Sequence, residues 1–279
     1  MRGRQTGPIT ELWQAVWDAP RPFVHPLRTR AGAVLTVEAP ADHPWHHALW
    51  STIKFVNGEN FWEEYGEFGL LRTTSVDRVD GPGGPVESAT IEWERPGGAG
   101  VVIDERRTIA HVGIADDAYA LDWVVELRPR VDVELDRTPY TTWGGYGGLT
   151  LRGAPDWTDT ALQLADDPAT HEQLRGEPAR WCHLQGRVGL DAGPAVAGVA
   201  ILDHPTNARH PTPWYASNRA DTYGEGWANF CNAAFLWNAP LEVAAGDVLT
   251  LRHRVVVHDG EWDPARVEAE WQGWTSSAG

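Results

Sequence analysis

Two long stretches of alternating apolar and polar side chains constrain the fold of this chain most strongly. In residues 118–127, large apolar side chains occupy every second position: Tyr119, Leu121, Trp123, Val125 and Leu127. Residues 248–258 repeat the pattern on one side with Leu249, Leu251, His253, Val255 and Val257. A period of two over this length is typical of an antiparallel strand with one buried face, because successive side chains of a strand point to opposite faces.

Shorter segments of strand character follow one another along the chain. They are residues 33–38, 51–56, 70–79, 86–93, 101–110, 149–152, 181–188, 195–202 and 228–237. Clusters of Gly and Pro, such as 81–84 and 96–98, lie between them and predict turns. Many strands with few crossover helices indicate a sandwich or a barrel. We therefore predict an all-β fold, a large antiparallel two-sheet β-sandwich of a dozen or more strands.

Helical signals are confined to the two ends of the chain. Residues 9–17 carry apolar side chains at a spacing that suits a short amphipathic helix. In residues 263–274, Asp263 is placed to cap a helix and Pro264 suits its first position. We expect this C-terminal helix to dock on the sandwich through an apolar stripe that consists of Val267, Trp271 and Trp274.

Composition narrows the class of protein. The 39 acidic and 23 basic residues give a formal charge of −16, which argues against nucleic acid or an anionic membrane surface as a partner. We find no apolar stretch long enough to span a bilayer, no secretory signal, and only two cysteines. A single cytoplasmic domain is therefore predicted over residues 8–274, with disordered tails at 1–7 and 275–279.

The segment 42–50 carries the densest signal for chemistry. Its residues are Asp42, His43, Pro44, Trp45, His46, His47, Ala48, Leu49 and Trp50. Pro44 holds His43 in an extended conformation, and His46 and His47 point to opposite sides of an extended chain. We therefore expect His43 with either His46 or His47 in a cleft, oriented by Asp42 as an acceptor. The indoles are candidates for the cleft wall, although most of the 16 tryptophans belong to the core.

A second polar cluster spans residues 203–214. It contains His204, Asn207, His210 and Trp214, and it follows an apolar strand, so it is predicted as a loop at a sheet rim. Three prolines in this loop lower the entropy that is lost when it is ordered, which favours a preorganised site.

Two further residues are candidates for contacts with a ligand. Glu63 follows Trp62 and, like Glu64 beside it, is suited to acid–base work if it is desolvated against that ring, although such acids are more often solvated. Arg152 ends a glycine-rich strand and is placed to clamp a carboxylate or hydroxyl groups. A nucleophile elbow, a phosphate-binding loop and cysteine pairs at zinc spacing are missing from the sequence, so acyl transfer is not expected.

Several of these motifs also carry a resemblance to a known family. They are Arg21-Pro22-Phe23, residues 42–50, Asn57-Gly58, Gly147-Gly148-Leu149 with Arg152, His204-Pro205 with His210-Pro211, and residues 251–260. In this order the chain resembles the bacterial PmoA-like proteins, labelled "methane oxygenase PmoA". The resemblance implies a galactose-mutarotase-like supersandwich, with His and carboxylate side chains on a concave sheet. Ala48 departs from the family pattern, which has glycine there in many members.

Our leading hypothesis is a carbohydrate-active enzyme, a hydrolase, lyase or epimerase that acts on a sugar or glycoside. Its predicted catalytic residues are His43, His47, His204, His210 and Asp42. Its predicted substrate-binding residues are Arg152, Asn207, Trp45, Trp50, Trp214 and Glu63.

Two other hypotheses stay open. The first is a metalloenzyme such as an oxygenase, as the family label implies, because two histidines and a carboxylate form a known iron site. Its candidate ligands for a divalent metal are His43, His46, His47 and His210, with Asp42. The second is a sugar-binding module without catalysis. No cofactor is assigned in the leading hypothesis, and a divalent metal is kept as an alternative.

Overall fold

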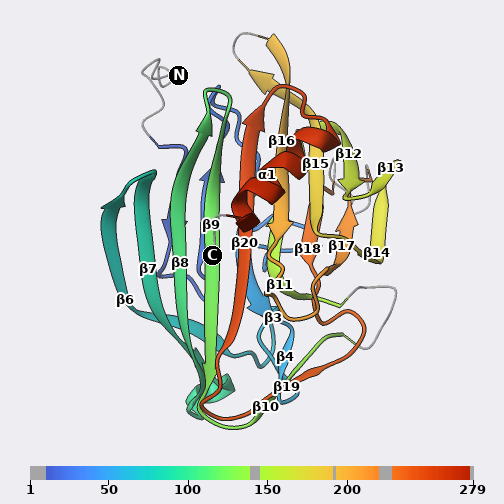
Figure 1. Ribbon diagram of the computed structural model, residues 1–279. Coiled ribbons are helices and arrows are strands. Elements are labelled where there is room, and N and C mark those ends of the chain that lie inside the picture. The colour runs from blue at the N-terminus through green and yellow to red at the C-terminus, as the bar shows by residue number, and fades with distance from the viewer. Residues whose placement is uncertain (1–10, 139–144, 191–192, 220–227, 277–279) are drawn as a thin grey trace.

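The computed structural model describes residues 11–138, 145–190, 193–219 and 228–276 (Figure 1). Strands make up 58% of the structure and helix 6%, so the prediction of an antiparallel all-β sandwich is confirmed. Two large sheets form its layers, and a small third sheet that the sequence did not indicate joins them at one end.

The larger sheet has nine strands, whose spatial order places the two alternating stretches side by side. In that order they are β13 (Asp167–His171), β12 (Thr158–Leu164), β15 (Trp181–Leu190), β16 (Gly193–Asp203), β20 (Leu249–Asp259), β9 (Ala118–Pro129), β8 (Val101–Ala115), β7 (Gly84–Glu94) and β6 (Leu70–Gly81). β9 and β20 pair antiparallel, with Leu121 opposite Val255. The predicted apolar faces of both strands turn inward, and their alternating side chains are mostly buried.

The second sheet has seven strands and carries the polar motif of residues 42–50 beside it. Its order is β1 (Trp13–Val16), β2 (Phe23–Leu27), β3 (Leu49–Ile53), β11 (Gly147–Arg152), β18 (Phe230–Ala233), β17 (Pro213–Ser217) and β14 (Gln173–Pro178). The small third sheet consists of β19 (Leu241–Val243), β10 (Val133–Asp136), β4 (Phe55–Val56) and β5 (Glu59–Asn60). A short 3-10 turn, η1 (Pro96–Gly98), follows β7.

The main core lies between the two large sheets. Leu149 and Leu151 of β11 and Trp214 of β17 meet Trp123 and Val255 of the larger sheet in one buried cluster. Eight buried tryptophans belong to this cluster, namely Trp13, Trp17, Trp93, Trp123, Trp157, Trp181, Trp214 and Trp262. Burial of such large apolar surfaces is the dominant favourable contribution to folding.

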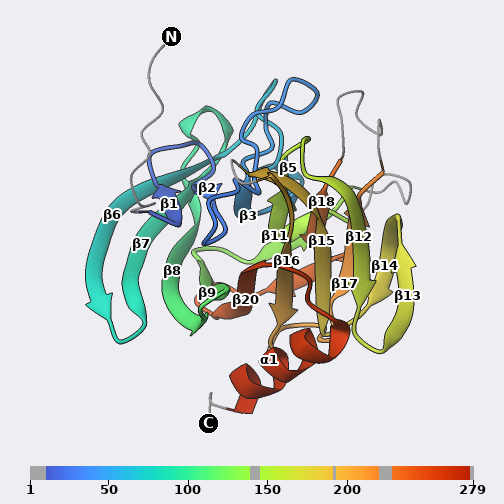
Figure 2. The same ribbon diagram turned by 90° about the horizontal axis from the view of Figure 1, so that it is seen from above.

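Helix α1 (Pro264–Ser276) covers the outer face of the nine-stranded sheet, so the larger sheet lies between α1 and the seven-stranded sheet (Figure 2). Asp263 caps it as predicted, because its Oδ1 accepts a hydrogen bond of 2.8 Å from the N–H of Arg266. Val267 is fully buried, and Trp271 and Trp274 pack against the core. The helix was expected to end at Trp274, but Thr275 and Ser276 continue it.

The N-terminal segment differs from its prediction. Residues 9–17 were expected to form a helix, whereas the described part contains β1, in which Trp13 and Ala15 are buried and Gln14 is exposed. Pairing with β2 supplies backbone partners that override the helical spacing of apolar residues. The tail predicted over 1–7, and residues 277–279 of the tail predicted over 275–279, lie outside the described residues.

Candidate functional site

The outer face of the seven-stranded sheet carries a polar and aromatic cluster. Strand alternation sends Leu49 and Leu149 into the core between the sheets and turns their neighbours outward. Register then places Trp50, Thr150, Asn232 and Tyr215 in one row across β3, β11, β18 and β17. A second, separate apolar cluster therefore forms on this face, in which Trp50, Trp62, Tyr215 and Phe230 are buried.

The loop that precedes β3 is folded against this face by its own backbone. The N–H of His43 donates to Pro40 O, and the N–H of His46 donates to His43 O, so two turns follow each other. Ala48 then adopts a φ of +56°, in the left-handed region that favours glycine, and its carbonyl accepts a hydrogen bond from the Arg152 N–H.

Asp42, His43, His46 and Arg152, which we call the His43 group, are the polar centre of the cluster. Oδ2 of Asp42 lies 2.9 Å from Nδ1 of His43 and 2.9 Å from Nη2 of Arg152. The Asp42 side chain is 10% exposed, that of Arg152 2% and that of His43 25%. Burial raises the pKa of Asp42, but the hydrogen bond from His43 and the charge of Arg152 outweigh it and lower that pKa overall.

His46 lies on the same side of the loop as His43. The two imidazole rings stack with centroids 4.6 Å apart and an interplanar angle of 21°, and Nη1 of Arg152 lies 3.5 Å from Nδ1 of His46. Burial, followed by the charges of His43 and Arg152, lowers the pKa of His46 well below its ordinary value. The ring of His46 is therefore neutral.

His47 points to the other side, as the extended backbone predicts. Its Nε2 lies 2.7 Å from Oε1 of Glu64, its Nδ1 lies 3.5 Å from Glu38, and its ring stacks on Phe23 at 5.3 Å. Of the two pairs left open by the sequence, the structure brings together His43 and His46. His47, a predicted catalytic residue, instead holds the segment of Glu64 against the sheet.

Aromatic side chains surround the His43 group in two layers. Trp45 meets His43 edge-on at 5.3 Å and Tyr65 at 5.1 Å, and Tyr65 is 61% exposed. Beneath them Trp50 is completely buried, with its ring 5.4 Å from that of His46. Trp45 therefore lies beside the partly exposed His43, where its contact with a ligand stays a prediction, whereas Trp50 is buried beneath the group.

Glu63 is held by a cation from the same face. Lys54, the single lysine of the chain, forms an ion pair with Glu63, and both side chains are nearly buried. Arg21 lies close enough for Glu64 and Glu63 to raise its pKa, although burial has the larger effect and lowers that pKa to about 10. The predicted role of Glu63 in substrate binding therefore competes with this ion pair.

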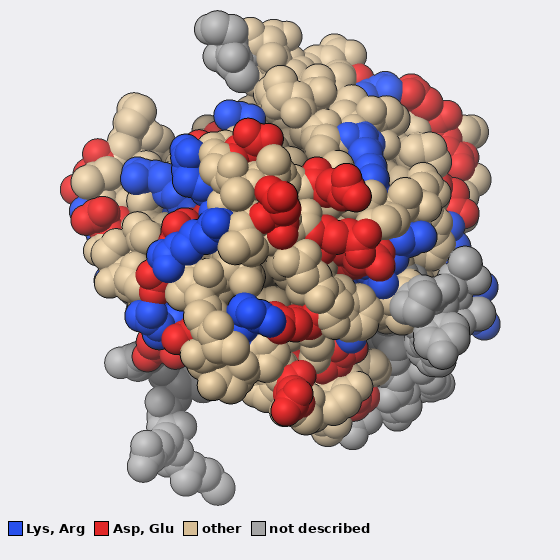
Figure 3. All heavy atoms as spheres, turned by 90° about the horizontal axis from the view of Figure 1, so that it is seen from below, with Lys and Arg blue, Asp and Glu red and all other residues tan. Residues whose placement is uncertain are grey.

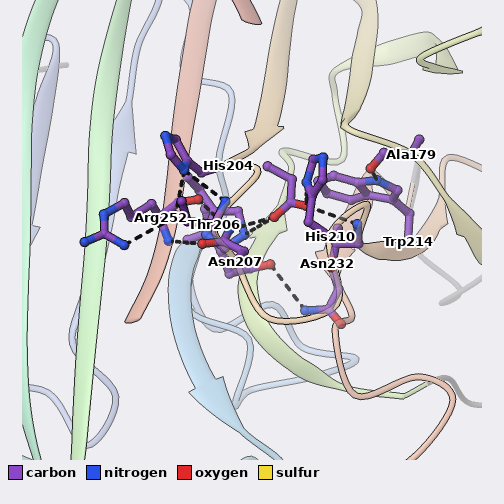
Figure 4. Close-up of polar contacts among 12 residues, drawn as sticks. Ala179, His204, Thr206, Asn207, His210, Trp214, Asn232 and Arg252 are labelled. Carbon is purple, nitrogen blue, oxygen red and sulfur yellow. Dashed lines mark hydrogen bonds and ion pairs between the residues drawn. The ribbon is translucent and has the colours of Figure 1, made fainter. Parts of the chain in front are cut away.

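The cluster predicted over residues 203–214 forms a closed hydrogen-bond network (Figure 4). Both carboxylate oxygens of the buried Asp203 are used: Oδ1 accepts from Asn207 at 2.7 Å, and Oδ2 lies 2.7 Å from His210 Nδ1 and 3.0 Å from the Thr212 N–H. We call Asp203, Asn207, His210 and Thr212 the Asp203 group. The Asn207 amide also exchanges two hydrogen bonds with the backbone of Arg252 in β20.

The Asp203 group lies under helix α1, on a different layer from the His43 group. Trp271 of α1 donates to Asp203 O at 2.9 Å and stacks on His210, and Trp274 meets His204 edge-on at 5.0 Å. These contacts run to the helix and to β20, whereas those of the His43 group run to β11 and to the outer aromatic cluster. The structure therefore does not bring His204, His210 and Asn207 to the side of His43, where the sequence hypothesis placed them.

Trp214 likewise does not line the candidate site. It is completely buried in the core between the sheets, and its indole N–H donates to Ala179 O at 2.9 Å (Figure 4). Its neighbour Tyr215 faces the outer cluster instead. The prediction that Trp214 lines a cleft is wrong, because strand alternation turns Trp214 into the core and its neighbour Tyr215 outward.

Metal ligation finds little support in the part of the chain that the structure describes. There, no group of three or more His, Cys, Asp or Glu side chains has the geometry to hold a metal ion. A groove lined by Asp132, Glu134, Glu242 and Asp247 lies over the paired strands β10 and β19, at the end of the molecule where acidic side chains gather (Figure 3). The residues that line this groove include no imidazole or large aromatic ring, the groups that make the His43 group a candidate for catalysis.

Three residues of the outer cluster, Tyr65, Lys54 and Tyr146, were not among the sequence candidates, and His46 was a candidate only beside His43 or as a metal ligand. The ring of Tyr146 stacks on Trp62 at 4.9 Å and meets Tyr215 edge-on at 5.6 Å. Lys54 offered a signal, because it continues the outward alternation of Trp50 and Thr52.

None of the helices in the described ranges is long and apolar enough to cross a membrane.

Comparison with known protein families identifies the family to which this chain belongs. A model described as "Family of unknown function (DUF6807)" matches residues 7–272, nearly the whole chain. The chain belongs to this family. No curated protein matches it.

Proposed function

We propose that this DUF6807 protein is a carbohydrate-active enzyme that works by histidine acid–base chemistry on the outer face of its seven-stranded sheet. The observation that carries the proposal is the partly exposed His43, held by the buried Asp42–Arg152 pair beside the Trp45–Tyr65 pair. A carboxylate-oriented imidazole is the usual general acid or base, and aromatic faces beside it suit the apolar faces of a sugar ring.

The resemblance to PmoA-like and galactose-mutarotase-like sandwiches supports this proposal, since such folds place histidines and carboxylates on a concave sheet. The chain has only two cysteines, too few for a disulfide scaffold, so we place the protein in the cytoplasm. The partner is a small carbohydrate.

A thermal-shift screen against monosaccharides, disaccharides, sugar acids and divalent metals tests the proposal, followed by a turnover assay on the sugars that bind. We expect sugars to raise the melting temperature, because a ligand that binds only the folded state stabilises it. The His43→Ala protein should keep its fold and lose about 10²- to 10⁴-fold in turnover. Full turnover by a folded His43→Ala protein would refute the assignment, and binding without any turnover would identify a sugar-binding module instead.

A further inference from the structure

The two stacked imidazoles of the His43 group carry their protons on different nitrogens. Nδ1 of His43 lies 2.9 Å from Oδ2 of Asp42, and an ionised carboxylate only accepts hydrogen bonds. The proton of the neutral ring is therefore on Nδ1. Its Nε2 then has a lone pair and acts as a base.

His46 has the opposite arrangement. Its Nδ1 faces Nη1 of Arg152 at 3.5 Å, and a guanidinium only donates hydrogen bonds. The lone pair of His46 is therefore on Nδ1 and its proton on Nε2. Burial and the neighbouring positive charge of Arg152 keep this ring neutral, because both lower its pKa.

Asp42 and Arg152 thus fix both tautomers through a single ion pair. Asp42 holds His43 as a base, and Arg152 holds His46 as a neutral hydrogen-bond donor, with the two rings 4.6 Å apart. A base beside a neutral imidazole donor is the combination needed to remove a proton next to a carbonyl and to stabilise the resulting oxyanion.

Resting on the proposed function, we infer that the substrate is a sugar with a carbonyl group, a keto sugar or an open-chain aldose, and that the reaction is proton transfer at the adjacent carbon. His43 Nε2 takes the proton, the C–H electron pair forms a C=C bond, and the carbonyl π pair moves to oxygen. The enolate oxygen accepts a hydrogen bond from His46 Nε2–H. Return of a proton to the same carbon restores the carbonyl, so exchange or epimerisation at that carbon needs no co-reactant.

The carboxylates fit this reaction better than glycoside hydrolysis. Hydrolysis uses two acids that flank the scissile bond, one of them as nucleophile or as base for water. Here Asp42 is engaged by both His43 and Arg152, Glu63 by Lys54 and Glu64 by His47. Each carboxylate near the imidazoles therefore has a positioning role already.

The experiment follows hydrogen exchange by NMR in D₂O with aldoses and keto sugars that bind in the thermal-shift screen, beside methyl glycosides that lack a carbonyl. We expect the intact protein to replace the hydrogen next to the carbonyl by deuterium and to leave the glycosides unchanged. His43→Gln should slow exchange about 10²- to 10⁴-fold. His46→Gln should slow it about 10²- to 10³-fold.

A matched control uses His171, whose Nε2 lies 2.9 Å from Asp167 on the surface, so His171→Gln removes a similar pair and should leave exchange unchanged. Asp42→Asn should lower kcat with KM unchanged, because an amide in place of the carboxylate no longer enforces the His43 tautomer. If sugars bind but none exchanges, the inference is overturned while the proposed function survives. If folded His43→Gln exchanges at the full rate, His43 is not the base and both are overturned. If no sugar binds, both are overturned.

Discussion

The His43 group and the Asp203 group have similar sequences, but they differ in how completely the fold buries them. Each contains an aspartate, a His-Pro step and nearby tryptophans. In the Asp203 group, the aspartate is completely buried and its oxygens bind side chains and backbone under α1. In the His43 group, Asp42 binds a histidine that stays partly exposed beside an exposed tyrosine. Similar polar residues thus stabilise the fold where their hydrogen-bond network is buried. Where one residue of the network is exposed to solvent, as His43 is, the network is accessible to a ligand.

The largest effect expected from this comparison is the loss of stability when Asp203 is changed. Asp203→Asn replaces one acceptor oxygen by a donor, which then faces either the amide of Asn207 or His210 and the Thr212 N–H. Charged hydrogen bonds of this kind contribute about 1.5–3 kcal/mol each, so we expect the free energy of unfolding to fall by about 3–5 kcal/mol in urea titrations.

The matched variant is His43→Gln, which changes a partly exposed side chain and should cost less than about 1 kcal/mol. Turnover per folded molecule should show the reverse order, with Asp203→Asn unchanged. A stable Asp203→Asn protein that has lost turnover would mean that the Asp203 group, and not the His43 group, performs the chemistry.

Local sequence was sufficient for the parts of the structure that depend on neighbours along the chain. The faces of β9 and β20 follow from alternation, and the start of α1 follows from Asp263 and Pro264. The helix expected over 9–17 was wrong, because pairing with β2 is a contact that local spacing does not reveal.

The site was predicted less completely, because it depends on contacts between distant segments. Segment 42–50 and Arg152 were recognised, but the choice of His46 over His47 follows from two turns and the left-handed Ala48. Trp214 was misplaced because the Pro-rich segment gave no strand signal, and its face depends on the register of β17 with β18. The carboxylate of Asp203 is bound by residues within nine positions of it, but its backbone carbonyl accepts from Trp271 of α1, a contact across 68 residues that local sequence does not reveal.

Acid should lower the free energy of unfolding, because the fold keeps two buried histidines neutral. His183 and His258 lie with their Nε2 atoms 2.9 Å apart, beneath Trp262 and beside Gln163, with Asp117 and Arg266 nearby. Burial lowers the pKa of His183 to about 3 and that of His258 to about 4.

Because the pKa values are lower in the folded chain, protonation of these histidines favours the unfolded chain. The unfolded chain binds protons near pH 6.5 and the folded chain only near pH 3–4, so the stabilisation is complete above pH 6.5 and is lost as the pH falls towards 4. At pH 5 each histidine should cost about 2 kcal/mol. Urea titrations between pH 7 and 5 check this, and a His183→Gln/His258→Gln protein should show a flatter dependence. An equal slope in that double variant would assign the acid sensitivity to other groups, such as the neutral His46.

The smallest effect tests the backbone that turns His46 inward. Ala48 occupies the left-handed region at φ +56°, which is strained for alanine by about 1 kcal/mol. Ala48→Gly relieves this strain, but it also removes a buried methyl group and adds freedom to the unfolded chain. Ala216→Gly in β17, also completely buried, suffers both losses without relief, so it should be less stable than Ala48→Gly by about 1 kcal/mol in urea titrations. Equal losses would show that the left-handed conformation of Ala48 carries no strain.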